Sequence, residues 1–537
     1  MIPVKPDAEL VTPEDARPAV TLKLRWSLLI ALAGGLLLAI SFPPVGIWPL
    51  VITGPALLAV ALSGRSLRAS FLIGLVFGVA FFFPLLSWVL NVAWYAWVAL
   101  AAASTVILAV FTIGQRVLLR VRGWPVAVAG WWVALEAFRD RWPWGGFPWG
   151  RLAMSQAGAP TAGWAALGGE PFLTFVLALT GAMLAWLVLT GIAGRWRTRR
   201  TALTAVAFVA VAAVAAGVPA ALTLDPVSPQ DPTAELAAVQ GDVPRGQSLA
   251  TQLNDAMVTA NHADATINLA NQIKDRKSPK PDLVIWPENS TDLDPLLYPQ
   301  IYDEVAGATD AVDAPLLVGE LLEAPLRNAG QLWLPGTGPT NQVYVKRQLV
   351  PFGEYIPFRS LLQKITPLTA LQPVNFTAGH KTVVFHVNSI RLGDVICYEI
   401  GFDNLVRSEV NAGANLLAVQ TNDATFEWDG QTGETGQQLA MARMRAVESD
   451  RAVVVASTTG YSAIIAPDGQ LIEKSGTWRQ TVLEAKVPLI TYTTLADRVG
   501  PWPEYIITIL TAIAFAAIAA AGLYPALRRR GAARSKG

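Results

Sequence analysis

Two long uncharged stretches constrain the fold of this chain more than any other feature of its sequence. Residues 171–194 and 201–224 contain no Asp, Glu, Lys or Arg. A helix of roughly 20 apolar residues crosses the hydrocarbon core of a bilayer, and a core helix of a soluble protein rarely stays uncharged for that length. The whole chain is 53% hydrophobic and only 15% charged, which is too apolar for a wholly soluble protein. We therefore expect a protein that crosses a membrane several times.

The same criterion predicts eight membrane-spanning helices, near residues 26–42, 46–62, 69–91, 95–115, 124–138, 171–194, 201–224 and 504–526. The segment after Trp26 lacks a small-residue cleavage pattern and runs into Phe42-Pro43-Pro44, so we interpret it as a retained helix and not as a signal peptide. The resulting domain boundaries are a disordered cytoplasmic lead at 1–25, a membrane domain of about seven helices at 26–224, a last helix at 504–526 and a basic cytoplasmic tail at 527–537.

Basic residues predict the side of the membrane that each connection occupies, because short loops rich in Lys and Arg stay in the cytoplasm. The strongest cluster, at 195–200, precedes the seventh expected span, and the basic tail follows the eighth. The loop at 139–151 is an exception, because it contains Arg139, Arg141 and Arg151 although it is expected outside the cytoplasm. Asp140 offsets part of this positive charge. The pattern places both termini in the cytoplasm and the long polar segment outside it. The formal net charge of +1 gives no support to nucleic-acid binding.

A second domain is expected at residues 235–492, where the hydrophobic period changes. Short β-rich runs such as PDLVIWPEN, ANLLAVQTND and AVVVASTTGYSAII alternate with helical patterns at 252–275 and 436–450. This alternation is typical of an α/β domain with layered sheets and helices outside them. Pro467-Asp468-Gly469 predicts a hairpin turn. Because the chain has a single cysteine, a hydrophobic core and not an internal disulfide must stabilise this domain.

Three reactive side chains each follow one of these β-rich runs. Glu288 follows LVIWP, Lys346 follows QVYV, and Cys397 follows GDVI. Taken singly, a strand-end carboxylate or lysine is usually a solvated residue, and a lone cysteine is usually a core residue. A thiol becomes a useful nucleophile when a cation lowers its pKa and a base takes its proton. A lysine can supply the cation, and a glutamate can act as the base.

Taken in series, the motifs W-P-E, Y-x-K-R-x-L-V-P-F-G-E-Y-x-P and C-Y-E resemble the glutamate, lysine and cysteine triad of the nitrilase superfamily. Seven expected helices before this domain, one after it, GGFPWGRLAMSQ at 145–156 and MARMRAVE at 441–448 together resemble the apolipoprotein N-acyltransferases of bacteria. The resemblance implies a multi-pass α-helical membrane domain joined to a nitrilase-like αββα sandwich, the carbon-nitrogen hydrolase fold.

The resemblance also implies roles for individual residues. Glu288 is expected to be the general base, Lys346 the cation beside the thiol and the developing oxyanion, and Cys397 the nucleophile. Supporting or substrate-binding roles are implied for Glu354, Tyr398, Glu399, Asn422 and Asp423. Two positions depart from the family pattern, namely Leu249 and Thr425.

The implied reaction moves a fatty acyl chain from a phospholipid, through a thioester on Cys397, to the N-terminal α-amine of the diacylglyceryl-cysteine of an apolipoprotein. No cofactor and no metal are expected, since the three histidines, His262, His380 and His386, lack ligand spacing. The family implies a monomer in the bacterial cytoplasmic (inner) membrane, with its catalytic domain on the periplasmic side.

Other motifs have structural interpretations. Met441, Met444 and Glu448 recur at helical spacing, which indicates a packing face. The aromatic cluster of Trp142, Trp144, Phe147 and Trp149 indicates a belt at the membrane interface. The apolar stretch at 357–376 is a hypothetical membrane-facing lid that would exclude water from a thioester.

Two other functions remain open at this point. A membrane-tethered amidase or nitrilase would use the same triad with water as the acceptor, and it would release free fatty acid or ammonia. A transporter or assembly scaffold would not be an enzyme. A transport pathway often requires charged residues at mid-depth in the membrane, and the clearest spans carry none. The sequence therefore favours the enzyme.

Overall fold

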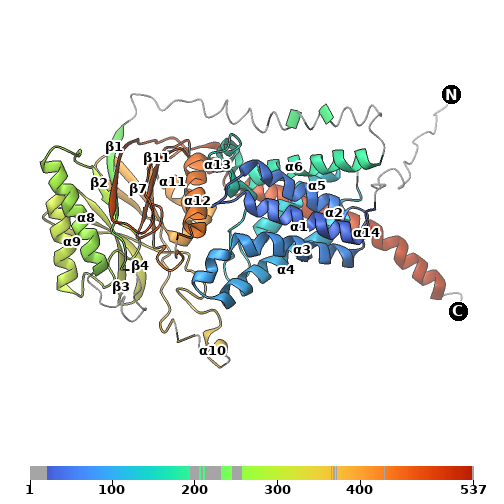
Figure 1. The fold of residues 1–537 in the computed structure, drawn as a ribbon, viewed down its shortest axis with the longest axis horizontal. Helices are drawn as coiled ribbons and strands as arrows, with labels where there is room; N and C mark the ends of the chain where they lie inside the picture. Colours follow the sequence, from blue (N-terminus) through green and yellow to red (C-terminus); the bar gives the residue numbers. More distant parts are fainter. Residues whose placement is uncertain are drawn as a thin grey trace, which may run out of the picture.

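The computed structural model describes residues 21–193 without 122, parts of 205–214, residues 232–244, and residues 257–534 without 365, 367, 368, 371, 428 and 429. The expected lead at 1–20, the basic cluster at 195–200, most of the span at 201–224, and Leu249 lie outside these residues. Within them the chain forms a bundle of apolar helices beside an α/β domain, which lies on the left in Figure 1.

The bundle contains α1 (Leu24–Ile40), α2 (Thr53–Leu62), α3 (Leu67–Leu85), α4 (Trp94–Leu118), α5 (Trp124–Arg139), α6 (Ala165–Ile192) and α14 (Trp502–Arg534). Four segments are long and apolar enough to cross a membrane: Leu67–Leu85, Trp94–Leu118, Ala162–Ile192 and Trp502–Ala521. The helices at 24–40, 53–62 and 124–139 are shorter than the roughly 20 residues of a full span. Pro43-Pro44 follows the first of them and cannot continue it, because proline lacks the backbone N–H. The bundle is a multi-pass membrane domain.

The α/β domain contains two six-stranded sheets. The first sheet has the order β12-β1-β2-β3-β4-β5 and the second the order β11-β10-β9-β8-β7-β6. The strands of the first are β12 (Thr481–Pro488), β1 (Thr233–Gln240), β2 (Leu283–Ile285), β3 (Leu316–Glu323), β4 (Leu326–Leu334) and β5 (Gly338–Val345). Those of the second are β11 (Leu471–Lys474), β10 (Ala463–Ile465), β9 (Val453–Ser457), β8 (Leu416–Thr421), β7 (Ile390–Ile396) and β6 (Val384–Val387).

Parallel pairing lies at the centre of each sheet. β2 pairs in parallel with β1 and with β3, and β8 pairs in parallel with β7 and with β9. Antiparallel strands complete the edges, including the hairpin of β10 and β11, where the N–H of Gly469 donates to the Ala466 carbonyl at 2.8 Å. The turn predicted at 467–469 is therefore confirmed.

Helices cover both outer faces of the two sheets. On the first sheet, α8 (Met257–Lys274) and α9 (Pro299–Val312) bury apolar residues against β2 and β3. On the second sheet, α11 (Asp403–Asn411) and α12 (Gly433–Ser449) lie between the strands and the membrane domain (Figure 1). The facing sides of the two sheets enclose a separate apolar core. These four layers confirm the predicted αββα sandwich.

The hydrophobic core of the membrane domain continues into the α/β domain without a break. Met441 and Met444 of α12 are buried in the same cluster as Phe81 of α3 and Trp149 of the α5–α6 connection. The packing face predicted on α12 therefore contacts the membrane helices. Since burial of apolar area is the main favourable term in association, this shared core holds the two domains together.

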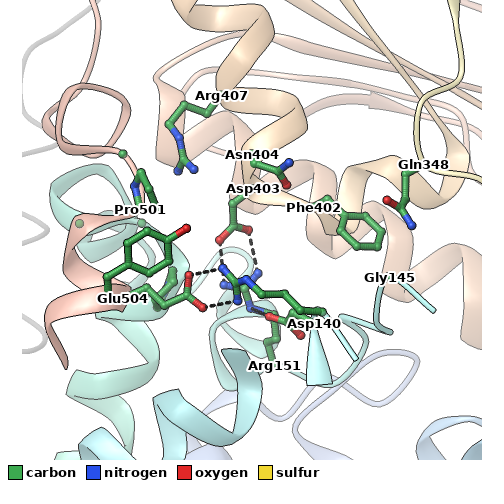
Figure 2. Close-up of a pocket in the computed structure, with 17 residues that line it drawn as sticks. Asp140, Gly145, Arg151, Gln348, Phe402, Asp403, Asn404, Arg407, Pro501 and Glu504 are labelled. Carbon is green, nitrogen blue, oxygen red and sulfur yellow. Dashed lines mark hydrogen bonds and ion pairs between the residues drawn. The ribbon is translucent and has the colours of Figure 1, made fainter. Parts of the chain in front are cut away.

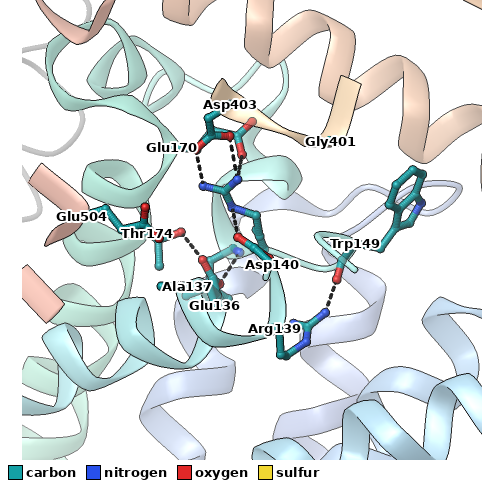
Figure 3. Close-up of polar contacts among 12 residues, drawn as sticks. Glu136, Ala137, Arg139, Asp140, Trp149, Glu170, Thr174, Gly401, Asp403 and Glu504 are labelled. Atoms are coloured by element: carbon teal, nitrogen blue, oxygen red, sulfur yellow. Dashed lines mark hydrogen bonds and ion pairs between the residues drawn. The ribbon is translucent and has the colours of Figure 1, made fainter. Parts of the chain in front are cut away.

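Polar contacts add to this junction, which also contains a cavity of about 290 Å³ (Figure 2). Arg151 of the α5–α6 connection donates to both carboxylate oxygens of Asp403, at 2.7 and 3.0 Å. Arg445 of α12 lies 2.6 Å from the same carboxylate. Figure 3 shows the adjoining contacts, in which Thr174 donates to Glu136 and Arg139 to the Trp149 carbonyl. Buried pairs of this kind fix the geometry of a junction, because removing one partner leaves an uncompensated charge.

Candidate active site

The predicted triad residues lie at strand ends that meet where the two sheets face each other. Lys346 directly follows β5, Cys397 directly follows β7, and Glu288 lies three residues after β2. Gln420 of β8 donates through Nε2 to the Trp286 carbonyl at 2.6 Å, so the second sheet is bonded to the chain just before Glu288. The carboxyl ends of central strands are where α/β sheets present functional groups.

Glu288 is buried and fully hydrogen-bonded. Its Oε1 accepts from Lys346 Nζ at 3.0 Å and from Asn328 Nδ2 at 2.5 Å, and its Oε2 accepts from the Asn422 N–H at 2.9 Å. Burial, the largest cause, raises the pKa of Glu288, and the Glu354 charge raises it further, while Lys346 lowers it. A carboxyl group in these surroundings is a suitable proton acceptor near neutral pH.

A glycine makes room for the turn that carries Glu288. A β-carbon at Gly319 of β3 would lie 2.0 Å from the Pro287 carbonyl oxygen and 2.9 Å from the Glu288 Cα. Any other residue at position 319 would therefore displace the turn. The N–H of Trp286 donates to the Leu317 carbonyl on the same strand, which anchors the start of the turn.

Lys346 lies between two carboxylates. Its Nζ donates to Glu288 Oε1 at 3.0 Å and to Glu354 Oε1 at 2.9 Å, and its side chain is 1% exposed. Burial alone would lower the pKa of Lys346, but the charges of Glu288 and Glu354 outweigh it and raise the pKa well above its usual value. Lys346 is therefore a fixed cation that stays charged. Glu354 is held in turn by the Val350 N–H, which donates to Oε2 at 2.7 Å.

Cys397 occupies a sharp bend between β7 and a short 3₁₀ helix, Cys397–Gly401. Its φ of +54° is in the left-handed region, which a residue with a side chain rarely adopts. Backbone strain of this kind costs about 1–3 kcal/mol and clusters at functional sites. The thiol is buried, and Gln438 Nε2 of α12 lies 3.6 Å from its Sγ.

The surroundings of Cys397 keep its thiol protonated. Burial, the largest cause, and the Glu288 charge raise its pKa well above the usual value, whereas the Lys346 charge lowers it. Both predicted partners are therefore close enough to act on the sulfur electrostatically. A thiol of this kind requires a base at the moment of attack, since the thiolate is the nucleophile.

Glu399 ties the bend at Cys397 to the turn after Lys346. Its Oε2 accepts from the Ile396 N–H and the Tyr344 hydroxyl, both at 2.8 Å. Its Oε1 accepts from the N–H groups of Arg347 at 2.7 Å and Gln348 at 2.9 Å. Glu399 is thus bonded to the backbone on both sides and positions the chain segments that carry Lys346 and Cys397.

Tyr398 points from the same bend into the membrane domain. Its hydroxyl donates to the Gly146 carbonyl at 2.6 Å, and its ring stacks on Trp149 with centroids 5.4 Å apart. Phe147 stacks in turn on Trp149 at 5.3 Å. The prediction of an interfacial belt is therefore wrong for Trp149, which is 2% exposed, because these rings pack against a residue far away in the sequence. Trp142 and Trp144 are exposed, as a belt requires.

Asn422 and Asp423 face different partners although they are adjacent. The Asn422 backbone N–H holds Glu288, whereas the Asp423 carboxylate accepts from the hydroxyls of Ser457 at 2.7 Å and Thr421 at 3.1 Å. Asp423 is also hydrogen-bonded to Glu434 at the start of α12. Burial, followed by the Asp423 charge, raises the pKa of Glu434 well above its usual value, so this pair shares a proton.

Three residues of the site were not predicted from the sequence: Asn328 of β4, Gln438 and Glu434. Asn328 bonds to both Glu288 and Glu354, and no motif surrounds it. Gln438 and Glu434 belong to the helix that the sequence identified as a packing element, and their shared spacing of four residues was the available signal. The described residues contain no group of three or more His, Cys, Asp or Glu side chains that could hold a metal ion.

Comparison with protein families gives two matches. A family model described as apolipoprotein N-acyltransferase N-terminal domain matches residues 34–183, and one described as carbon-nitrogen hydrolase matches residues 322–497. Lys346 and Cys397 lie within the second match, whereas Glu288 precedes it. The two matches separate the same two domains that the fold shows.

Curated proteins match over almost the whole chain. The apolipoprotein N-acyltransferase of Mycolicibacterium smegmatis is 36% identical over 501 residues, which cover 89% of this chain and 83% of that protein. The protein of the same name from Pseudomonas syringae is 29% identical and covers 90% of this chain and 95% of its own length. That from Azotobacter vinelandii is 28% identical, with 88% and 92% covered.

Among solved structures, a mutant of the Nesterenkonia AN1 amidase from the nitrilase superfamily matches with 16% identity and a TM-score of 0.36. The match covers 50% of this chain and 95% of that chain.

Proposed function

The chain belongs to the apolipoprotein N-acyltransferase family, and from this membership we propose that it transfers a fatty acyl chain from a phospholipid to the N-terminal α-amine of the diacylglyceryl-cysteine of apolipoproteins. The observation that carries the proposal is the buried contact of Glu288 with Lys346, at the strand ends beside the only cysteine of the chain. Such strand ends are where α/β sheets bind their ligands, which supports a site at this position.

In the first half-reaction, Glu288 takes the proton of the Cys397 thiol, and the sulfur attacks the ester carbonyl of the phospholipid. A C–S bond forms and the ester C–O bond breaks, and the departing lysophospholipid alkoxide receives the proton from Glu288. Lys346 and the backbone N–H groups that follow Cys397 stabilise the oxyanion. The raised pKa of Cys397 supports this sequence of events, because a protonated thiol depends on the base.

In the second half-reaction, the α-amine of the acceptor attacks the thioester. The amide C–N bond forms and the C–S bond breaks, while Glu288 accepts a proton from the amine and passes it to the departing Cys397 thiolate. The thioester retains the acyl group after the first lipid has left, which two bilayer-anchored substrates require. Water would hydrolyse this intermediate, so the site must be closed.

We propose that the apolar loop at 357–376 supplies a cover of this kind at the membrane surface. Its short helix α10 (Arg359–Leu362) projects away from both domains in Figure 1. Phe358 and Leu361 are 68% and 56% exposed. The ring of Trp144, from the membrane domain, lies 6.5 Å from that of Phe358, so the loop begins beside the membrane interface. We propose that it inserts into the bilayer surface as a lid.

The catalytic domain is proposed to lie on the periplasmic side of a bacterial inner membrane, with both termini in the cytoplasm. Gln437 of α12 donates to the carbonyls of Pro43 and Leu85, so α1 and α3 end beside the α/β domain. Their opposite ends carry the basic residues Lys23, Arg25, Arg65 and Arg68. Arg116, near the end of α4, joins them by donating to the Arg65 carbonyl at 2.6 Å. Basic residues therefore gather on the far side, as the cytoplasmic side requires.

Two of the three arginines in the loop at 139–151 no longer count against this orientation once their partners are known. Arg139 and Arg151 lie on the side of the α/β domain, yet both are buried. Arg139 donates to the Trp149 carbonyl (Figure 3), and Arg151 is paired with Asp403. Because these charges are buried and bonded inside the protein, they do not act as loop charges that determine topology.

The test of this function is acceptor dependence. The purified chain is incubated with an unlabelled phospholipid and a synthetic peptide that carries an N-terminal diacylglyceryl-cysteine. The products are analysed by mass spectrometry. An N-acylated peptide that forms only with intact Cys397 supports the proposal. Release of free fatty acid at the same rate with or without the peptide would instead identify a membrane-tethered hydrolase.

A further inference from the structure

The polar cavity at the junction of the two domains lies away from the triad. Its volume is about 290 Å³, near the lower end of small-molecule sites. Its walls come from the α5–α6 connection, from the start of α11 and from the start of α14 (Figure 2). None of Glu288, Lys346 and Cys397 lines it. The cavity is therefore separate from the proposed catalytic site.

Three arginines and three carboxylates line the cavity, and only one of the arginines lacks a close partner among the described residues. Arg141 is paired with Glu504 by two hydrogen bonds of 2.7 and 2.6 Å. Asp403 is paired with both Arg151 and Arg445. Arg407 points toward the cavity in Figure 2 and has no hydrogen bond or ion pair with the other residues that the structure describes. Asp403 and Asp497 act on Arg407 electrostatically but do not pair with it, so its N–H groups can hydrogen-bond to a phosphate.

Unsatisfied buried polar atoms also point to a missing partner, namely the donor Arg151 Nε and the acceptor Asp140 Oδ1. Arg151 is 3% exposed, and its Nε has no hydrogen-bond partner among the described residues. The nearest carboxylate oxygen of Asp140 lies 3.4 Å from it, too far for a good hydrogen bond. Buried polar groups are normally paired, so an unpaired guanidinium N–H beside a cavity indicates that a polar ligand or water belongs there.

The cavity lies where the membrane helices end on the side of the α/β domain. α5 ends at Arg139, α14 begins at Trp502, and α6 leaves helical geometry at Gly168 and Gly169. Trp502 and Tyr505 are 63% and 42% exposed, and exposed aromatic residues of this kind mark the headgroup level of a bilayer. Arg141, whose side chain is 51% exposed, brings the cavity to the surface.

An apolar stripe continues from the cavity down the C-terminal helix. Ile506, Ile509, Leu510 and Ile513 of α14 recur at helical spacing and are 52–61% exposed. Such a stripe can pack against acyl chains whose headgroup occupies the cavity. A free phosphate ion has no acyl chain and would not contact this stripe.

We propose that this cavity binds the phosphate-bearing headgroup of a membrane phospholipid, with Arg407 as its main cation and the acyl chains along α14. The lipid is not the acyl donor, since the cavity does not reach Cys397. The bound headgroup contacts both domains, because Arg407 belongs to the α/β domain and Tyr505 to the membrane domain. This site is independent of the proposed catalytic function.

The single cysteine of the chain makes a site-specific test possible. Full-length protein carrying Cys397→Ala and Trp502→Cys is labelled with a fluorophore and purified in detergent. It is then titrated with a phospholipid that carries a nitroxide on its headgroup, and quenching is measured. A second chain, with Cys397→Ala and Trp94→Cys, reports lipid contact at another exposed helix end. Because both chains lack the thiol, no chemistry contributes to the signal.

The expected result is saturable quenching at position 502, with an apparent affinity that falls about tenfold in Arg407→Gln, as for loss of a charged hydrogen bond. Arg407→Lys, which keeps the charge, should retain most of the affinity. Arg498→Gln, an exposed arginine of α13 (Leu495–Val499) that does not line the cavity, is the matched control and should change nothing. Quenching at position 94 should not respond to any of these substitutions.

Three results would overturn the proposal. Quenching at position 502 that is unchanged by Arg407→Gln would show that the cavity is not the binding site. Equal quenching by a nitroxide-labelled diacylglycerol without phosphate would show ordinary contact with acyl chains. Displacement of the labelled phospholipid by millimolar inorganic phosphate would show an anion site without preference for lipid.

Discussion

Lys346 Nζ lies 3.0 Å from Oε1 of Glu288, and both side chains are almost completely buried. The two residues are far apart in the sequence and come from different strands of one sheet. Lys346 also donates to Glu354, so one positive charge is shared between two carboxylates. This arrangement keeps one negative charge uncompensated beside the only thiol of the chain, which is the condition for a base that can accept its proton.

The pH dependence of acylation should report on this pair. Glu288 must be ionised to act as a base, so the rate of acylation should fall as the pH falls through its pKa, which burial raises above the usual range for glutamate. The Glu354 charge also raises that pKa. Glu354→Gln should therefore move the acid limb of the pH–rate profile to lower pH. The measurement is the rate of lysophospholipid release as a function of pH, and a limb that stays in place or moves upward would refute the electrostatic account.

Glu399→Gln should slow acylation while the protein remains folded. A glutamine has one carbonyl oxygen, so it cannot accept all four hydrogen bonds that reach Glu399 from both sides of the site. A misplacement of about 1 Å of reacting groups can cost about 10²-fold in rate. Glu473→Gln, on the exposed strand β11, is the matched control. Full activity of Glu399→Gln would mean that this clamp does not position the thiol.

The shared proton of Asp423 and Glu434 predicts a pH-dependent gain in stability. The pKa of Glu434 is raised in the folded state, by burial first, so its stabilising contribution is present below about pH 4.3, the value of an unfolded glutamate. It is lost as the pH rises toward the folded-state pKa. Glu434→Gln imitates the protonated acid and should raise the thermal unfolding temperature at alkaline pH but not at acidic pH. An equal effect at both ends of the range would contradict the assignment.

Polar substitutions in the lid should affect lipid substrates selectively. Phe358→Ser together with Leu361→Ser removes two exposed apolar side chains, each worth about 1.5–3 kcal/mol when buried in the bilayer surface. Acylation by phospholipid vesicles should fall at least about tenfold, whereas acylation by a short, water-soluble ester should not change. Leu471→Ser, on β11, serves as the control. An equal loss with both substrates would indicate damage to the site and not to a lid.

Local patterns in the sequence predicted the layers of the fold and the three strand-end residues. Glu288, Lys346 and Cys397 each follow an apolar run, and their order along the chain matches a known arrangement. The membrane helices were predicted in the same way, because an uncharged apolar run has few other stable environments. The short helix at 53–62 shows the limit of this approach, since proline residues and tight turns shorten an apolar run in ways that hydropathy does not show.

Contacts between distant segments could not be predicted from the sequence. Asn328 reaches Glu288, and Gln438 reaches Cys397, across intervals that carry no shared pattern. The aromatic cluster alone predicts Trp149 at the membrane surface, whereas in the structure Tyr398 covers it. Arg151 resembles a topology-determining loop charge in the sequence, because its partner, Asp403, lies in the other domain. These residues obtain their roles only from the packing of distant chain segments against one another.

The most direct measurement for the central claim is the mass of the protein after incubation with phospholipid in the absence of an acceptor. The account predicts an increase equal to one fatty acyl group, which neutral hydroxylamine removes and which Cys397→Ala abolishes. A folded, detergent-purified protein that shows no such adduct, and that also releases no fatty acid, would contradict the thioester mechanism and would leave Cys397 as a buried core residue.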